Sequence, residues 1–222
     1  MPTETPARLR AARPALGLIL GLILDLMLGL APASVRAQPA PGGTVAWHCY
    51  RNGVAAVLAT ENTESVGTKF LVRPATADLK ADCTVEQRPT DRVLGVDTAT
   101  ENFAHSYIDL VKAFLIVDDG TGPDRGLVIY EVPAGRKLLD DGYSVQGSCI
   151  PTAGCRSEEF MIDDKGLTFW RTIADKPTPK NCPGYAGFMK TTGAAALEER
   201  SVFSFATRKL TGSGQRRCTA RQ

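Results

Sequence analysis

The stretch Gly126-Leu127-Val128-Ile129-Tyr130-Glu131-Val132 (GLVIYEV) decides the fold class of this chain. Its β-branched and aromatic residues are the types that are enriched in β-strands. The stretch is short, and it follows Asp118–Asp124, a segment rich in Asp and Gly of the kind that forms turns. GLVIYEV therefore predicts a β-strand.

Segments of the same kind recur along the chain. Strands are predicted for Val45–Tyr50, Val54–Ala59, Thr68–Arg73, Cys83–Gln87, Ile108–Val117, Tyr143–Gly147, Phe160–Ile162, Leu167–Ile173 and Val202–Thr207. Only Thr192–Arg200 (TGAAALEER) has the composition of a helix, because Ala, Leu and Glu favour helices. The sequence thus predicts many short strands and one short helix.

Acidic turn signals support an antiparallel arrangement of these strands. Asp118-Asp119-Gly120, Asp140-Asp141-Gly142 and the turn that starts at Asp163 begin 22 and 23 residues apart. Such a spacing suits two short strands with their turns, whereas a parallel α/β fold needs longer helices between its strands. The expected fold is all-β and mostly antiparallel: a single disulfide-stabilised domain built as a meander, a sandwich or part of a propeller.

The N-terminal segment has the three parts of an export signal. Arg8, Arg10 and Arg13 precede the apolar run Leu16–Leu30, and small residues before Gln38 form a cleavage site. The run of about 15 residues is shorter than the roughly 20 that span a bilayer. We therefore expect no stable membrane span after cleavage, and a protein of the bacterial envelope that is periplasmic or secreted.

The expected domain organisation follows from this signal. Residues 1–37 are predicted to be the signal peptide, 38–44 a flexible lead-in, and 45–222 a single β-rich domain with a basic C-terminal tail.

Charge excludes one class of partner and favours another. Removal of residues 1–37 takes four of the 26 basic and two of the 24 acidic residues, which leaves 22 of each. A neutral chain argues against nucleic acid, because binding to phosphates normally needs a basic face. Six basic residues and no acidic one follow Glu199, so this terminus could attract an anionic cell-wall polymer; the alternative is a solvated terminal strand and tail.

Six cysteines follow the signal, an even number that predicts three disulfides in an exported chain. One pair brackets a short loop with Pro and Gly that can bring its ends together. A second pair falls on predicted strands that can be neighbours, and the third would fasten the C-terminal tail to the body. The expected bonds are Cys149–Cys155, Cys49–Cys83 and Cys182–Cys218.

The segment Thr152-Ala153-Gly154-Cys155-Arg156 resembles the nucleophile segment of the L,D-transpeptidases, exported enzymes that crosslink peptidoglycan through a cysteine thiolate. The resemblance implies a cysteine enzyme centred on Cys155. It covers five residues, and Pro133–Thr152 lacks the upstream histidine that such enzymes use as a base. His105, fifty residues before Cys155, is the nearest histidine that could serve as one.

No cofactor or metal ion is expected. The chain has no Cys-x-x-Cys pair, and neither His48 nor His105 has a ligand partner at the usual spacing. The acidic loop Asp118–Asp124 lacks the alternating acids and the terminal glutamate of a calcium-binding EF-hand.

Aromatic residues on strands and in a Pro/Gly-rich loop are the candidate binding residues. Phe169 and Trp170 are adjacent on a predicted strand, so they must point to opposite faces, one to the core and one to the rim. Trp47 lies on another strand and Tyr185 in the loop Pro177–Gly187. An aromatic side chain with polar neighbours is a typical binding hot spot.

Two segments are similar to parts of small periplasmic lysozyme inhibitors. These are the cysteine-bearing start Cys49-Tyr50-Arg51-Asn52-Gly53 and the late aromatic strand Gly166-Leu167-Thr168-Phe169-Trp170. The likeness serves as an example of the class that we expect: a non-enzymatic binding or inhibitor module whose partner is an envelope protein or an anionic polymer. The cysteine enzyme remains the alternative.

Overall fold

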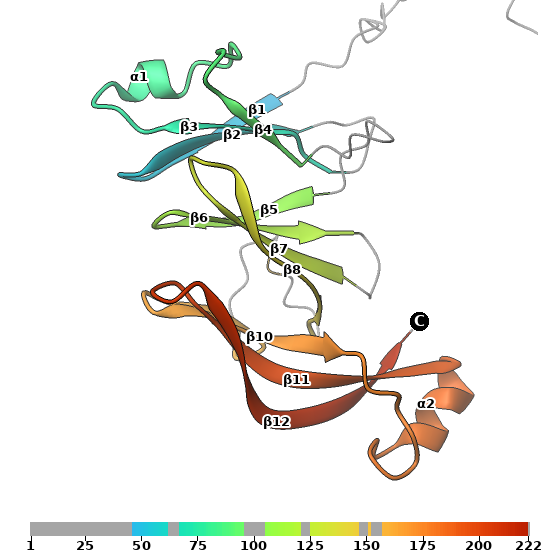
Figure 1. Cartoon of the computed structure of the whole chain (residues 1–222). Helices are drawn as coiled ribbons and strands as arrows, with labels where there is room; N and C mark the ends of the chain where they lie inside the picture. Colours follow the sequence, from blue (N-terminus) through green and yellow to red (C-terminus); the bar gives the residue numbers. More distant parts are fainter. Residues whose placement is uncertain are drawn as a thin grey trace, which may run out of the picture. The chain divides into compact units, whose positions relative to one another are not determined.

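The computed structural model describes residues 46–61, 67–95, 105–120, 125–146, 151 and 157–221 (Figure 1). The chain divides into two units, 1–39 and 40–222, and all described residues belong to the second, which alone is treated below. They form twelve strands and two short helices, and every strand pair is antiparallel. The predicted fold class is therefore confirmed. The predicted signal peptide and lead-in lie outside the described residues.

The first sheet has four strands in the order β1-β2-β3-β4. Its elements are β1 (Ala46–Arg51), β2 (Ala55–Glu61), β3 (Phe70–Pro74) and β4 (Arg92–Leu94), with the short helix α1 (Leu79–Asp82) between the last two.

The second sheet has eight strands, and the candidate sites lie on this sheet and on the helix between two of its strands. Seven follow the order β12-β11-β10-β8-β7-β6-β5, and the short strand β9 pairs with β10. The elements are β5 (His105–Val111), β6 (Phe114–Asp119), β7 (Arg125–Glu131), β8 (Arg136–Ser144), β9 (Phe160–Ile162), β10 (Gly166–Ile173), the helix α2 (Tyr185–Thr191), β11 (Ala194–Ser204) and β12 (Lys209–Arg221).

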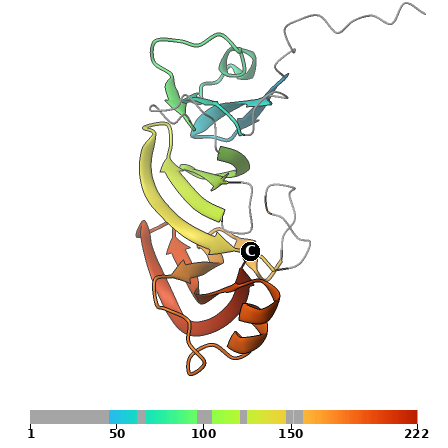
Figure 2. The same ribbon diagram turned by 90° about the vertical axis from the view of Figure 1, so that its right-hand side faces the viewer.

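The eight-stranded sheet folds back on itself between β8 and β10. These two strands pair at only two positions, Trp170 with Ser144 and Arg171 with Tyr143. Three strands separate β6 from β11 in the sheet order, yet the ring of Phe114 on β6 lies 6.0 Å from that of Phe203 on β11. The two halves thus face each other, and Figure 2 shows the strong curvature of the β11–β12 hairpin.

Strands β6 and β7 contribute to two hydrophobic cores because successive residues point to opposite faces. Ile116, Leu127 and Ile129 belong to the core between the two halves of the large sheet. Leu115, Val117 and Val128 belong to a second core that includes residues of β2 and β3. Burial on both faces explains why GLVIYEV is almost continuously apolar.

The prediction of a helix at Thr192–Arg200 is wrong, because these residues form most of β11. Strand β11 pairs with both β10 and β12 along most of its length. Leu197 and Glu198 are both buried, on opposite faces of the strand. Helix propensity differs by only a few tenths of a kcal/mol per residue among such residues, so tertiary pairing decides the structure. The structure instead has the helix α2, which begins at Tyr185 inside the predicted loop Pro177–Gly187, so the loop prediction is wrong for its last three residues.

The prediction of a turn at Asp140-Asp141-Gly142 is also wrong, since these residues lie within β8 and the chain turns at Val132–Gly135 instead. The turn between β9 and β10 is where it was predicted, at Asp163–Lys165. Ile108–Val117 contains a further turn, at Lys112 and Ala113, that divides it between β5 and β6.

The prediction of a strand at Cys83–Gln87 is wrong, and the side chain of Arg73 explains what replaces it. Arg73 is almost fully buried on β3. Its guanidinium donates hydrogen bonds to the backbone carbonyl oxygens of Asp82, Thr84 and Glu86, and one to the carboxylate of Asp91 at 2.6 Å. These carbonyl groups thus find their donor in a side chain rather than in a neighbouring strand.

Two of the three predicted disulfides are confirmed. Cys49–Cys83 and Cys182–Cys218 are bonded, with Cα–Cα distances of 5.6 and 5.1 Å. The first pair was predicted on the assumption that both cysteines lie on neighbouring strands. Cys83 instead follows the end of α1, so the bond joins this helix end to β1. The predicted Cys149–Cys155 pair lies outside the described residues.

We expect loss of the Cys182–Cys218 bond to lower stability substantially. The bond closes a sequence separation of 36 residues, and on the loop-entropy model its removal costs about 3 to 4 kcal/mol. Replacing both cysteines by serine should lower the melting temperature more than the same change at Cys149 and Cys155, because those two enclose only a short loop. Thermal unfolding of the two double variants measures this; equal melting temperatures would contradict it.

The predicted basic tail is part of the sheet. Residues 209–221 form β12, which pairs with β11 in a long hairpin. Neither helix in the described part of the chain has the length and hydrophobicity of a membrane span.

Candidate functional site

Of the two predicted catalytic residues, His105 is among the described residues and Cys155 is not. Cys155 lies outside the described residues, so the cysteine enzyme remains a prediction. His105 begins β5, and its Nε2 lies 3.3 Å from the hydroxyl of Tyr130. Burial lowers the pKa of His105, which keeps the imidazole neutral at pH 7. His48 is exposed on β1, with its ring stacked on that of Tyr50.

Phe169 and Trp170 point to opposite faces of β10, as predicted, but neither is exposed. Phe169 is fully buried in the core of the large sheet. Trp170 is 5% exposed because guanidinium groups cover its ring, with Arg217 4.1 Å and Arg200 5.8 Å from the ring centre. Cation–π contacts of this kind stabilise the fold, so these two residues pack within the protein.

A buried glutamate lies next to Trp170 on the same face. Glu198 on β11 is fully buried, and its Oε1 accepts hydrogen bonds from the hydroxyls of Ser144 at 2.5 Å and Thr219 at 2.7 Å. Oε1 also accepts a hydrogen bond from Arg221 Nη2 at 2.7 Å, and Oε2 accepts one from Arg217 Nε at 2.5 Å. We call this set of five residues the Glu198 cluster.

The Glu198 cluster is held together as an ionised group. Burial by itself would raise the pKa of Glu198, but the hydrogen bonds from Ser144, Thr219 and Arg217 outweigh it and lower that pKa. The carboxylate is therefore charged at neutral pH and fixes both arginine side chains.

The arginines of β12 are engaged in ion pairs rather than forming an open basic surface. Arg216 lies 2.9 Å from Asp175, and Arg217 contacts Glu159 as well as Glu198. These ion pairs could not be predicted from the sequence of the C-terminus, because the acidic partners come from other segments. The one sequence feature that pointed to them was the acidic pair Glu198-Glu199, which lies across the β11–β12 hairpin from Arg216-Arg217.

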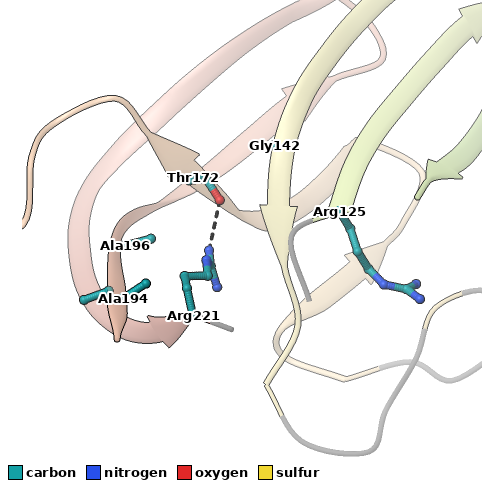
Figure 3. Close-up of a pocket in the computed structure, with 7 residues that line it drawn as sticks. Arg125, Gly142, Thr172, Ala194, Ala196 and Arg221 are labelled. Carbon is teal, nitrogen blue, oxygen red and sulfur yellow. Dashed lines mark hydrogen bonds between the residues drawn. The ribbon is translucent and has the colours of Figure 1, made fainter. Parts of the chain in front are cut away.

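A pocket of about 380 Å³ adjoins the Glu198 cluster where β8 and β10 diverge. Its lining residues are Arg125, Gly142, Thr172, Ala194, Ala195, Ala196 and Arg221. Figure 3 shows Ala194, Ala196 and Arg221 on one side, with Gly142 and Arg125 on the other. Arg221 Nη2 donates to the hydroxyl of Thr172 at 3.1 Å, whereas the guanidinium of Arg125 points away from Arg221, toward Asp118.

The helix α2 carries the second candidate site. Tyr185, Phe188 and Met189 share one face of α2, because they are three and four positions apart. No residue of α2 is buried, Tyr185 and Phe188 are half-buried, and Met189 is 40% exposed. Figure 1 shows α2 beside the ends of β11 and β12.

Three exposed lysines lie on α2 or on the segment that leads into it. Lys176, Lys180 and Lys190 are exposed, and none forms an ion pair with a described residue. Cys182, which is bonded to Cys218 on β12, ties the segment to the sheet. We call Lys176, Lys180, Tyr185, Phe188, Met189 and Lys190 the α2 surface.

The remaining predicted binding residue, Trp47, is half-buried on β1 and belongs to neither site. Of the four aromatic candidates, Tyr185 is the one on the same segment as the exposed lysines Lys176, Lys180 and Lys190.

Comparison with known proteins gives no match: no family model matches the sequence, no curated protein matches it, and no solved structure matches the fold.

Proposed function

We propose that this protein is a non-enzymatic binding module that holds an anionic polymer of the bacterial cell envelope on its α2 surface. The observation that carries the proposal is the combination, on one disulfide-tethered segment, of a partly exposed aromatic face and three lysines that form no ion pair with a described residue. The envelope location rests on the predicted export signal at residues 1–37.

The chemistry of the α2 surface suits such a polymer. Lysine ammonium groups are compact charges that attract phosphates and carboxylates without demanding one geometry. Tyr185 and Phe188 offer flat apolar area for the sugar rings or acyl groups between those charges. The arginines of β12 do not compete for such a polymer, because they are engaged with Asp175, Glu159 and Glu198.

The Cys182–Cys218 disulfide helps to hold the α2 surface in one conformation before a ligand binds. The segment that carries Lys176 and Lys180 has little regular secondary structure, and ordering it on binding would cost free energy. The bond to Cys218 and the hydrogen bonds of Asn181 to Thr178 and Lys176 reduce that cost.

We expect charge reversal on the α2 surface to weaken binding to lipopolysaccharide. The triple variant Lys176→Glu, Lys180→Glu, Lys190→Glu should bind immobilised lipopolysaccharide at least about tenfold more weakly, the factor that corresponds to 1.4 kcal/mol. Wild-type binding should also weaken as salt is raised, because ions screen exposed charges. Surface plasmon resonance at two salt concentrations measures both effects.

The matched control carries the same change of net charge elsewhere. Lys80, Arg92 and Lys209 are exposed and distant from α2 in sequence, so the variant with glutamate at these three positions should bind like the wild type. Equal losses in both triple variants would mean that only net charge matters. Absence of binding by the wild type would overturn the proposal.

A further inference from the structure

The turn between β1 and β2 contains the pair Asn52-Gly53, which belongs to neither candidate site. Asn52 is half-buried and Gly53 is exposed. Apart from its chain neighbours, no atom lies within 4 Å of the position that a Cβ on Gly53 would take, and its φ is outside the left-handed region. The turn would therefore accept a larger residue at position 53, so the backbone conformation does not require a glycine there.

The side chain of Asn52 joins the first sheet to the second. Its Nδ2 donates to the carbonyl oxygen of Lys112 at 2.7 Å and to that of Leu110 at 3.5 Å, both at the end of β5. Its Oδ1 accepts from the backbone N–H groups of Val54 at 2.8 Å and Ala55 at 3.1 Å. These bonds require an amide, because an amide supplies both a carbonyl oxygen and an NH₂ group.

The same arrangement favours attack on this amide by the next backbone nitrogen in the chain. Gly53 has no side chain to obstruct the approach of its nitrogen to Cγ of Asn52, and its N–H donates to no described residue. As the new bond forms, negative charge develops on Oδ1, where the N–H groups of Val54 and Ala55 already point. Paired backbone donors of this kind stabilise the tetrahedral intermediates of acyl transfer.

We propose that Asn52 is a site of spontaneous deamidation in the folded protein, and that its conversion detaches the β1–β2 turn from the end of β5. The nitrogen of Gly53 bonds to Cγ, the Cγ–Nδ2 bond breaks, and the proton that Gly53 loses leaves with Nδ2 as ammonia. Water then opens the cyclic imide at either carbonyl, which leaves aspartate or isoaspartate at position 52. Either product has a carboxylate and no NH₂ group, so the carbonyl oxygen of Lys112 would lose its donor.

Asn181 provides an internal control in the same molecule. Its Oδ1 also accepts from a backbone N–H, that of Thr178 at 2.7 Å, and its Nδ2 donates to the carbonyl oxygen of Lys176 at 3.1 Å, but Cys182 follows it. The native protein is incubated at mildly alkaline pH and mapped by mass spectrometry of its peptides. Conversion at Asn52 should be at least about tenfold faster than at Asn181. Comparable rates at the two asparagines, or conversion at Asn52 only after unfolding in urea, would overturn the proposal.

Two variants separate the reaction from its consequence. Gly53→Ala leaves the hydrogen bonds of Asn52 in place and should slow the conversion at least about tenfold, because a Cβ hinders the approach of the nitrogen. Asn52→Asp has the carboxylate from the start and should increase the hydrogen–deuterium exchange of the β1–β2 turn and of residues 110–113, whereas Gly53→Ala should not. An unchanged rate in the first variant, or unchanged exchange in the second, would contradict the proposal.

Discussion

Replacing Arg73 by methionine is expected to lower the free energy of unfolding by about 3 to 5 kcal/mol. Methionine keeps most of the aliphatic volume but removes every hydrogen bond of the guanidinium. The carboxylate of Asp91, which is fully buried, would then lose its positive partner. The carbonyl groups of Asp82, Thr84 and Glu86 would lose their donor as well. Urea unfolding measures the change.

An exposed arginine provides the control. Arg136 pairs with Glu131, but its side chain is 58% exposed, and such pairs contribute at most about 1 kcal/mol. Arg136→Met should therefore change stability little. A loss below about 1 kcal/mol for Arg73→Met would mean that the segment after α1 is held by something other than this arginine.

The second large effect is expected at Glu198. Glu198→Gln removes the negative charge that Arg217 and Arg221 share, and it turns one acceptor into a donor that faces other donors. We expect a loss of about 3 kcal/mol, since two partly buried guanidinium groups would remain beside a neutral group. Asp175→Asn, which disturbs the exposed pair with Arg216, is the control and should cost little.

The pH dependence gives this prediction a second readout. The folded state lowers the pKa of Glu198, so its stabilising effect is fully present above the pH at which free glutamate titrates, about 4.3, and is lost as pH falls through the lower folded pKa. The difference in stability between the wild type and Glu198→Gln should therefore shrink as the pH is lowered from 6 to about 3. A constant difference would show that the charge of Glu198 is not what stabilises the cluster.

The sequence predicted what depends on local pattern and missed what depends on tertiary partners. GLVIYEV and the aromatic run at Leu167–Ile173 carry enough β-propensity to identify β7 and β10 directly. The segment Thr192–Arg200 could not be assigned in this way, because its strand structure comes from pairing on both sides. The irregular conformation of Cys83–Gln87 depends on the side chain of Arg73, which is ten or more residues away in the sequence. The hydrophobic periodicity of the segment cannot predict such a contact.

The candidate sites show the same contrast between what local sequence pattern predicts and what depends on tertiary partners. The Pro/Gly-rich segment before Tyr185 was recognisable from composition, although Tyr185 itself begins helix α2 instead of lying in a loop. The pair Cys182–Cys218 that tethers this segment was also predicted. The pocket was not, since its residues come from β7, β8, β10, β11 and β12 and include three alanines and a glycine. The basicity of the C-terminus was visible, but its neutralisation by Asp175, Glu159 and Glu198 requires the fold.

The claim that the α2 surface holds an anionic polymer is tested most directly by hydrogen–deuterium exchange of the wild-type protein with and without lipopolysaccharide. We expect added protection in peptides that cover residues 176–190, with the exchange of β5 to β8 unchanged. Protection confined to other segments, or none at a lipopolysaccharide concentration that saturates binding, would contradict it.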